Sequence, residues 1–392
     1  MVKRTPYSII IGVLLFGSLA ACASSSSEIA SYGKPVMTTS ASVAVIQESE
    51  SLPEPELVEL TKIVFDDTLE PTLSDTGEIV YNYEIFTMTA DGTNLQNLTN
   101  NAARDEEPEW SPDGRQIAFV SNRVSNGNGS IYLMNSDGSG VQALTTNELN
   151  SESQPLWSPD GNKIAFLGSI KVDPAPGGLR LDVYVIDTDG NNLRNLTAGI
   201  GDQNFVDFFD FSWSPDGKKI VVESDEYDPV DESYSDNLCV IDLSSSDVKQ
   251  LTFNHANENP VWSPDGTTIA FSIGIGRPVE FNITLINEDG SNIRELTSGT
   301  HPLWSPSGEQ LAFEHENRIY IMDADGSKIR PIANFDGTCT NPLAITSSAS
   351  WSQDGEKISF IAGCSNAILT VDVETGEVTD SNVSGNNIKV RP

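Results

Sequence analysis

The stretch Pro108-Glu109-Trp110-Ser111-Pro112-Asp113-Gly114 is one of six in which a Trp-Ser pair opens a tight turn. These copies contain every tryptophan of the chain: Trp110, Trp157, Trp213, Trp262, Trp304 and Trp351. An aromatic residue that is confined to one place in a repeat packs once in each structural unit. The stretch therefore marks a repeat, and the length and content of that repeat decide the fold.

Successive tryptophans are 47, 56, 49, 42 and 47 residues apart, which is the length of a four-stranded antiparallel propeller blade. Between them, β-branched and aromatic residues recur with a period of two, as in Ile117–Ser121 and Ile131–Met134. This period predicts half-buried strands and argues against stacked pairs of helices.

Two turns in each unit have a clear chemical basis. Ser111-Pro112-Asp113-Gly114 suits a type I turn, because Pro presets φ, Asp bonds its own backbone and Gly takes the left-handed conformation. Asp137-Gly138 predicts a second hairpin. Four units carry a proline two places before the tryptophan: Pro108, Pro155, Pro260 and Pro302. A central strand excludes proline, so this strand is predicted to be the innermost edge, facing the channel.

The number of blades follows from the second hairpin, which occurs seven times. Its copies are Asp91-Gly92, Asp137-Gly138, Asp189-Gly190, Ser245-Ser246, Asp289-Gly290, Asp325-Gly326 and Thr375-Gly376. Residues 71–79 align with 108–117 if Leu73 replaces the tryptophan and one residue is deleted. We therefore predict an all-β propeller of seven four-stranded antiparallel blades over residues 57–392. Six blades is the alternative, with the first or last hairpin as a closing flap. Residues 57–61 could supply an outer strand to the last blade and so close the ring.

The first 22 residues predict export. Lys3 and Arg4 precede an apolar run from Ile9 to Leu19, and Leu19-Ala20-Ala21-Cys22 resembles a bacterial lipobox. The resemblance implies a lipoprotein signal peptide over residues 1–21 and lipidation of Cys22. A plain secretory signal with an incidental cysteine is the alternative, and the run is shorter than the ~20 residues of a membrane-spanning helix.

Residues 22–56 are rich in Ser, Thr, Ala and Glu, which predicts a flexible linker between the lipid anchor and the propeller. Ala23 is not the Asp that resembles an inner-membrane retention signal. We expect the periplasmic face of the outer membrane in an organism with two membranes, and otherwise the outer face of the cytoplasmic membrane.

The charge balance limits the classes of molecule that the protein is expected to bind. The chain has 57 Asp and Glu against 22 Lys and Arg, a formal net charge of -35. This field disfavours nucleic acid and anionic lipid surfaces, whereas cations, basic proteins and neutral glycans are compatible with it. Solubility alone is the simpler explanation of the same charge.

Three cysteines follow Cys22, and export permits a disulfide. Cys339 lies in the connection to the last tryptophan unit, and Cys364 follows the second strand of that unit. Both connections emerge on the same face, so we predict a Cys339–Cys364 disulfide. Cys239, between Leu238 and Val240, is predicted to be a buried free thiol.

The functional candidates gather on one face. In a propeller both tight turns emerge on one face and the longer connections on the other, which we call the turn face and the loop face. The predicted partner-binding residues of the loop face are Asp105, Glu106, Glu107, Glu152, Asp202, Asp207, His255, Glu258 and His301, with a long acidic loop over 225–236 nearby.

Carboxylates and imidazoles could converge on the same face to form a metal site. His255, His301 and His315 are the candidates, but no pair has metal-ligand spacing within one element. We therefore predict no metal site and no cofactor, although a bound divalent cation is compatible with this face.

Taken together, the unit Pro-x-Trp-Ser-Pro-Asp-Gly-x-x-Ile-Ala-Phe, then Ile-Tyr-x-Met-x-x-Asp-Gly, then Leu-Thr, resembles the repeat of the TolB-type β-propeller. It occurs at 108–145, 155–197, 260–297 and 302–332. The best-known member of that family also has an amino-terminal α/β domain and binds envelope proteins in the periplasm. We expect this chain to have a lipidated tether in place of that domain, and the resemblance still implies a binding scaffold.

Two enzyme classes use related propellers. Prolyl-oligopeptidase-type peptidases add a hydrolase domain with a Gly-x-Ser-x-Gly elbow, which this chain lacks. Propeller lyases of acidic oligosaccharides use a His-rich metal site, but a net negative chain would repel such substrates. We therefore expect a monomeric, non-catalytic lipoprotein that binds or scaffolds envelope proteins through its loop face. A metal-dependent oligosaccharide lyase is the alternative.

Overall fold

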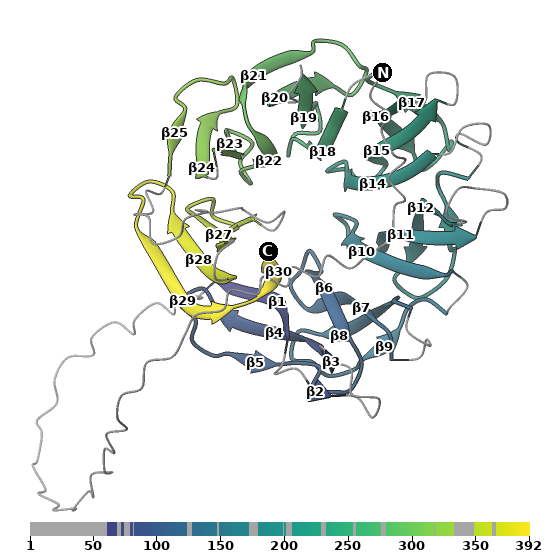
Figure 1. Cartoon of the computed structure of the whole chain (residues 1–392), viewed down its shortest axis with the longest axis vertical. Helices are drawn as coiled ribbons and strands as arrows, with labels where there is room; N and C mark the ends of the chain where they lie inside the picture. The colour runs from purple at the N-terminus through teal and green to yellow at the C-terminus, as the bar shows by residue number, and fades with distance from the viewer. Residues whose placement is uncertain are drawn as a thin grey trace, which may run out of the picture. The chain divides into compact units, whose positions relative to one another are not determined.

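The computed structural model of the chain describes residues 61–68, 72–73, 79–80, 82–123, 128–146, 149–171, 179–198, 200, 206–228, 233–253, 256–275, 280–316, 318–332, 349–362 and 366–392. Seven four-stranded antiparallel sheets form a ring around a channel (Figure 1), together with one two-stranded hairpin. The predicted seven-bladed all-β propeller is therefore confirmed. The propeller belongs to the unit Leu60–Pro392. The signal peptide, Cys22, the linker, Cys339 and Cys364 lie outside the described residues.

Each blade runs from an inner strand a to an outer strand d. Blade 1 consists of β30 (Asn386–Val390), β1 (Lys62–Thr68), β4 (Tyr83–Thr89) and β5 (Gln96–Asn97). Blade 2 consists of β6 (Asp105–Trp110), β7 (Gln116–Ser121), β8 (Ser130–Asn135) and β9 (Gln142–Ala143). Blade 3 consists of β10 (Ser151–Trp157), β11 (Lys163–Lys171), β12 (Leu179–Asp187) and β13 (Arg194–Asn195). Blade 4 consists of β14 (Val206–Trp213), β15 (Lys219–Asp228), β16 (Ser233–Asp242) and β17 (Val248–Gln250).

Blade 5 consists of β18 (Ala256–Trp262), β19 (Thr268–Ile275), β20 (Glu280–Asn287) and β21 (Arg294–Ser298). Blade 6 consists of β22 (Thr300–Trp304), β23 (Gln310–His315), β24 (Arg318–Asp323) and β25 (Arg330–Pro331). Blade 7 consists of β26 (Ser350–Trp351), β27 (Lys357–Ala362), β28 (Ala367–Asp372) and β29 (Val378–Ser384). The extra hairpin pairs β2 (Thr72–Leu73) with β3 (Ile79–Val80), between β1 and β4.

The ring closes differently from the prediction. The carboxyl-terminal strand β30 is the inner strand of blade 1, where Val390 pairs with Ile63 of β1. The backbone N–H of Val390 donates to Ser350 Oγ. Val390 takes the place of a tryptophan, because Trp110 pairs with Ile117 in the same way in blade 2. Leu73 does not, because it pairs within the extra hairpin. The outer strand of blade 7 is β29 rather than residues 57–61. The predicted number of blades was right. The predictions that Leu73 replaces a tryptophan and that residues 57–61 form the outer strand of the last blade were wrong.

The Ser-Pro-Asp-Gly turn forms as its chemistry predicts. In blade 2, Ser111 Oγ donates to Asp113 Oδ1 at 2.7 Å and accepts from the backbone N–H of Gln116 at 2.9 Å. Gly114 takes a φ of 64° and donates its N–H to the Ser111 carbonyl. The turn thereby fixes the register between strands a and b.

The core lies between neighbouring blades. A buried phenylalanine stands at the same place in strand b of several blades: Phe65, Phe119, Phe166, Phe271, Phe313 and Phe360. Blade 4 has the smaller Val222 there, and the fully buried Phe208 of strand a packs into the same cluster. Cys239 belongs to this cluster and is buried, as predicted, and it forms no disulfide with another described residue.

The Leu-Thr pair at the end of each repeat has a structural role. Thr145 Oγ1 accepts the backbone N–H of Ile131, and Thr197 Oγ1 accepts that of Val183. The threonine therefore completes the hydrogen bonding of strand c where the short strand d ends. In the described part of the chain, no helix is long and apolar enough to cross a membrane.

Candidate functional site: the loop face and the channel pocket

The inner strands share a bulge near the loop face. The pairing register of strands a and b shifts at this point in six blades. A non-glycine residue takes a left-handed φ between 47° and 55° in five of them: Glu107, Gln154, Asn259, His301 and Asn387. Such backbone costs free energy and persists only where neighbours hold it. The bulges place polar side chains around the loop-face end of the channel.

At four of these five positions, a side chain of the preceding blade accepts the backbone N–H. Asp66 Oδ1 accepts from the N–H of Glu107 at 3.1 Å, and Glu107 Oε2 accepts from that of Gln154 at 2.6 Å. The carboxyl group of Glu223 accepts from the N–H of Asn259. Carboxyl groups at the channel mouth therefore join successive blades.

Seven of the nine predicted partner-binding residues are described, and they fall into two groups. Asp105 is fully buried and ion-paired with Arg123 at 2.9 Å. Glu152 is buried and accepts from the Ile131 N–H at 2.9 Å. Both carboxylates are therefore occupied by the fold. The others lie on the loop-face halves of inner strands: Glu106, Glu107, Asp207, Glu258 and His301. Asp202 and His255 lie outside the described residues.

An acidic row crosses blade 4. Asp207 of β14 pairs with Asp225 of β15, and Asp225 pairs with Asp236 of β16, so three carboxylates lie directly opposite one another. The segment 225–236 was predicted to be a loop, but it continues β15 to Asp228 and begins β16 at Ser233. Burial, and then the Asp236 and Asp207 charges, raise the pKa of Asp225 to about 7. Like charges directly across a sheet destabilise it.

Glu223 lies two residues from Asp225 in β15 and was not among the residues predicted from the sequence. Its side chain is only 7% exposed. Burial, and then the charges of Asp210, Asp236 and Glu258, raise its pKa to about 9. An available signal was its place in strand b, where blades 2 and 3 have Val120 and Leu167.

A pocket of about 250 Å³ opens in the channel beside blades 4 to 7. Its apolar wall includes Phe211, Leu303 and Phe313, and its polar groups include Asp210, Asn259, His301 and Glu314. Asn259 Nδ2 donates to Asp210 Oδ2 at 2.7 Å, while the buried Asn259 Oδ1 has no hydrogen-bond partner among the described residues. Lys389 also lines the pocket, which thus combines an apolar wall with polar groups of both charges.

The two described histidines contact different groups. His301 Nδ1 lies 3.5 Å from Glu314 Oε2, whereas His315 packs edge-on against Tyr320 with ring centroids 5.7 Å apart. Within the described ranges, no three His, Cys, Asp or Glu side chains are arranged to hold a metal ion. His255, the third candidate, lies outside those ranges.

Fold and site together define a seven-bladed β-propeller with an acidic loop face. The sequence pattern of the TolB beta propeller domain matches residues 68–173 and 155–302, together more than half of the 392 residues. The chain belongs to the TolB β-propeller family, which confirms the family resemblance of its repeat.

Two curated relatives match parts of the chain. An uncharacterized protein of Agrobacterium fabrum is 29% identical over 135 residues, 34% of this chain and 45% of that protein. The uncharacterized peptidase YuxL of Bacillus subtilis is 25% identical over 192 residues, 45% of this chain and 23% of that protein. The matches span less than half the length of either relative.

Solved structures of several activities share the fold. An oligogalacturonate lyase from Vibrio parahaemolyticus superposes with a TM-score of 0.56 at 15% identity, covering 81% of this chain and 85% of that one. A puromycin-hydrolyzing peptidase of Mycobacterium tuberculosis gives 0.59 at 14% identity, covering 82% and 52%. TolB from Acinetobacter baumannii gives 0.48 at 20% identity, covering 85% and 67%. Likeness at these identities shows the fold alone.

Proposed function

We propose that this protein is a non-catalytic binding protein of the cell envelope, exported and anchored through a lipidated Cys22, which docks other envelope proteins on its loop face. The observation that carries this proposal is the acidic row Asp207–Asp225–Asp236. Within the described residues, no Lys or Arg forms an ion pair with these carboxylates. A row that costs stability in the free protein gains from a partner that brings positive charge.

Exposed apolar side chains beside the row support protein docking. Phe253 is 60% exposed and Ile275 is 38% exposed. Phe253 lies in the connection from blade 4 to blade 5, and the pairing of Ala256 with Gly274 brings Ile275 to the same end of blade 5. An exposed aromatic residue next to charged groups is typical of the anchors that dominate protein interfaces. The expected partner is therefore a basic protein surface with an apolar pocket.

Site-specific photo-crosslinking in intact cells tests the proposal. A photoreactive residue at Phe253 on the loop face is compared with one at Leu95, which is 49% exposed beside a tight turn of blade 1. We expect a discrete protein adduct from Phe253 that is absent from Leu95 and is lost in the Asp225→Asn/Asp236→Asn variant. Loop-face docking would be refuted if both positions gave the same adducts, or if the adduct from Phe253 persisted in the double variant.

The lyase alternative receives no specific support from this face. The two described histidines point to different neighbours, as the contacts of His301 with Glu314 and of His315 with Tyr320 show. A polyanionic substrate would also meet the row of blade 4, in which Asp225 and Asp236 form no ion pair with a cation of the described residues. The binding function is therefore the one that the geometry favours.

A further inference from the structure

A groove of about 460 Å³ opens on the turn face between blades 3 and 4, opposite the acidic face. Its walls carry three cationic side chains, Lys163, Arg194 and Lys218, and its apolar surface includes Val185 and Leu243. None of its lining residues is acidic, although the chain as a whole has a formal charge of -35. The groove is independent of the loop face, so its function is a separate question.

The serine-rich turn of blade 4 shapes one wall of the groove. In blade 3 the turn closes with the Gly190 N–H donating to Asp187, three residues back, whereas in blade 4 the Ser246 N–H donates to Asp242, four residues back. The longer turn presents the Leu243 carbonyl and the Ser246 hydroxyl toward blade 3.

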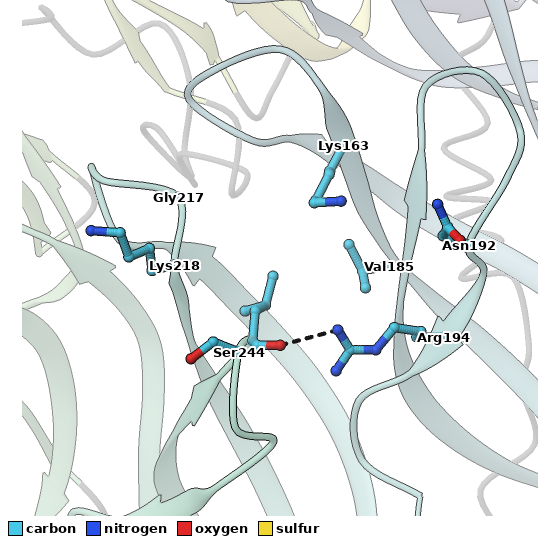
Figure 2. A pocket seen from close by; sticks show the side chains of 8 residues that line it. Lys163, Val185, Asn192, Arg194, Gly217, Lys218 and Ser244 are labelled. Atoms are coloured by element: carbon cyan, nitrogen blue, oxygen red, sulfur yellow. Dashed lines mark hydrogen bonds between the residues drawn. The ribbon is translucent and has the colours of Figure 1, made fainter.

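Arg194 reaches across this junction. Its guanidinium donates to the Leu243 carbonyl and to Ser246 Oγ, both at 3.0 Å. Both acceptors are neutral, and no carboxylate of the described residues lies within ion-pair distance of this guanidinium. Figure 2 shows Lys163 and Arg194 directed toward the middle of the groove on either side of Val185, with Lys218 directed away. The hydrogen bonds therefore fix the positive charge of Arg194 without neutralising it.

The two lysines differ in how easily each could contact a ligand in the groove. Lys163 forms an ion pair with Asp187. Lys218 pairs with Asp216 at 3.1 Å, but both side chains are more than half exposed. Such an exposed pair contributes little to stability. Lys218 can therefore swing toward a ligand in the groove at little cost.

The junction between blades 6 and 7 has the same arginine-to-carbonyl hydrogen bond but different charges around it. Arg330 donates to the Val373 carbonyl at 2.8 Å, just as Arg194 donates to that of Leu243. At the places of Lys163, Lys218 and Ser244, however, that junction has Gln310, Glu356 and Glu374. Joining two blades explains both arginines, but it does not explain the cationic wall of the groove between blades 3 and 4.

We propose that this groove binds a peptide segment in which a single carboxylate stands next to an apolar side chain. The planar guanidinium of Arg194 matches a carboxylate, and Val185 and Leu243 match its apolar neighbour. The field of the whole protein repels a dianion more strongly than a monoanion, which favours a carboxylate over a phosphate group. The protein then has two docking surfaces of opposite charge preference on its two faces.

A fluorescent peptide is the direct probe. Its core is Leu-Glu-Leu between serines, with both ends blocked so that the Glu side chain is its only carboxylate, and the matched peptide has Gln instead. We expect the Glu peptide to bind the full chain at least roughly tenfold more tightly than the Gln peptide, as measured by fluorescence anisotropy. Equal affinity for the two peptides would overturn the proposal.

Matched variants locate the binding. Lys218→Glu/Ser244→Glu introduces two of the three side-chain differences of the junction between blades 6 and 7, and it keeps Lys163 and the two acceptors of Arg194, the Leu243 carbonyl and Ser246 Oγ. Both positions are exposed, so losing the surface contacts of Ser244 with Asp242 and of Lys218 with Asp216 should lower the thermal midpoint only slightly. We expect this variant to lose at least roughly tenfold in affinity, and Arg330→Gln to bind as the unmodified chain does. Unaltered binding by the double variant would place the peptide elsewhere and refute the groove.

Discussion

The tryptophan at the end of each inner strand joins its blade to the preceding one. The indole N–H of Trp157 donates to the Glu109 carbonyl of the preceding blade at 3.2 Å, and the indole N–H of Trp213 donates to the Leu156 carbonyl at 3.1 Å. Trp262 is as deeply buried, but its indole nitrogen has no hydrogen-bond partner among the described residues. The same residue type in the same repeat position thus makes a polar contact in some blades and only an apolar one in others.

This difference can be measured with two substitutions. Trp157→Phe removes a hydrogen bond and leaves the Glu109 carbonyl without that donor, whereas Trp262→Phe removes only an unpaired donor and similar apolar area. We expect Trp157→Phe to reduce the free energy of unfolding by about 1 kcal/mol more than Trp262→Phe, as measured by urea denaturation. Equal losses would show that the indole N–H contributes nothing to the blade contact.

Glu223 makes the stability of the propeller depend on pH. Its pKa rises from 4.5 in the unfolded chain to about 9 in the fold, because burial and then the nearby carboxylates disfavour the charged form. The folded chain therefore holds a proton that the unfolded chain releases above pH 4.5. The stabilisation from this group is full below its unfolded pKa and is lost as the pH rises through about 9.

Glu223→Gln should remove this part of the pH dependence, because Gln keeps an acceptor for the Asn259 N–H and does not ionise. We expect its thermal midpoint to fall less between about pH 6 and about pH 9 than that of the unmodified chain. Glu309→Gln, at an exposed position, is the control and should leave the profile unchanged. Parallel profiles for Glu223→Gln and the unmodified chain would contradict the assignment.

At the scale of elements, β30 decides whether the ring is closed. It pairs with β1 from the opposite end of the chain, and Ile388 within it is fully buried in a cluster with Phe65 and Ile361. Without β30, the edge of β1 would be free to pair with other chains.

Ile388→Ala tests this closure. The substitution removes a buried side chain between the first and last blades, and we expect it to reduce the free energy of unfolding by roughly 2–5 kcal/mol. Val378→Ala on the outer strand β29 is the matched control, since Val378 is 36% exposed, and should cost less than about 0.5 kcal/mol. A similar small loss at both positions would mean that β30 contributes little to the ring.

The sequence analysis identified every blade but not this closing strand, and the reason is physical. The Trp-Ser-Pro-Asp-Gly motif marks the hairpin between strands a and b, so it is found only where these strands follow one another in the chain. In blade 1 they come from opposite ends, and Val390 stands where a tryptophan would otherwise be. The degenerate match at Leu73 was therefore not a weak copy of the motif but an unrelated hairpin.

At the scale of the whole molecule, the two faces differ in how their charges are used. Loop-face arginines are paired with neighbouring acids, as Arg104 is with Glu106 at 2.7 Å and Arg180 with Asp182 at 2.9 Å. Many other cations stand at strand ends beside the tight turns: Lys62, Arg115, Lys163, Arg194, Lys218, Lys219, Lys249, Arg294, Lys328, Arg330, Lys357 and Arg391. On the opposite face, carboxylates such as Asp225 and Asp236 form no ion pair with any cation of the described residues.

The sequence sufficed to assign residues to a face, because the order of antiparallel strands fixes where each connection emerges. It did not suffice to find the acidic row. The alignment of Asp207, Asp225 and Asp236 depends on the register of three strands and on the extension of β15 and β16 through a segment that looked like a loop. Burial of Glu223 likewise follows from blade packing rather than from its sequence neighbours.

The acidic row should make the stability of the propeller sensitive to salt. Repulsion among its carboxylates is strongest when the pH is above the pKa of Asp225, which is about 7, and when the ionic strength is low. Asp225→Asn/Asp236→Asn removes two of the three charges. At about pH 8 and about 10 mM salt, we expect this variant to have a thermal midpoint about 2 °C higher than the unmodified chain.

The difference should shrink at about 150 mM salt, where the screening length falls from about 30 Å to about 8 Å. Glu374→Gln removes one exposed carboxylate of the turn face and should change the free energy of unfolding by less than about 0.5 kcal/mol at either salt concentration. A stabilisation that persists undiminished at high salt would show that packing or hydrogen bonding at Asp225 and Asp236, rather than repulsion, sets the cost of the row. If the difference does shrink, the same repulsion is the free energy that a basic partner would relieve on docking.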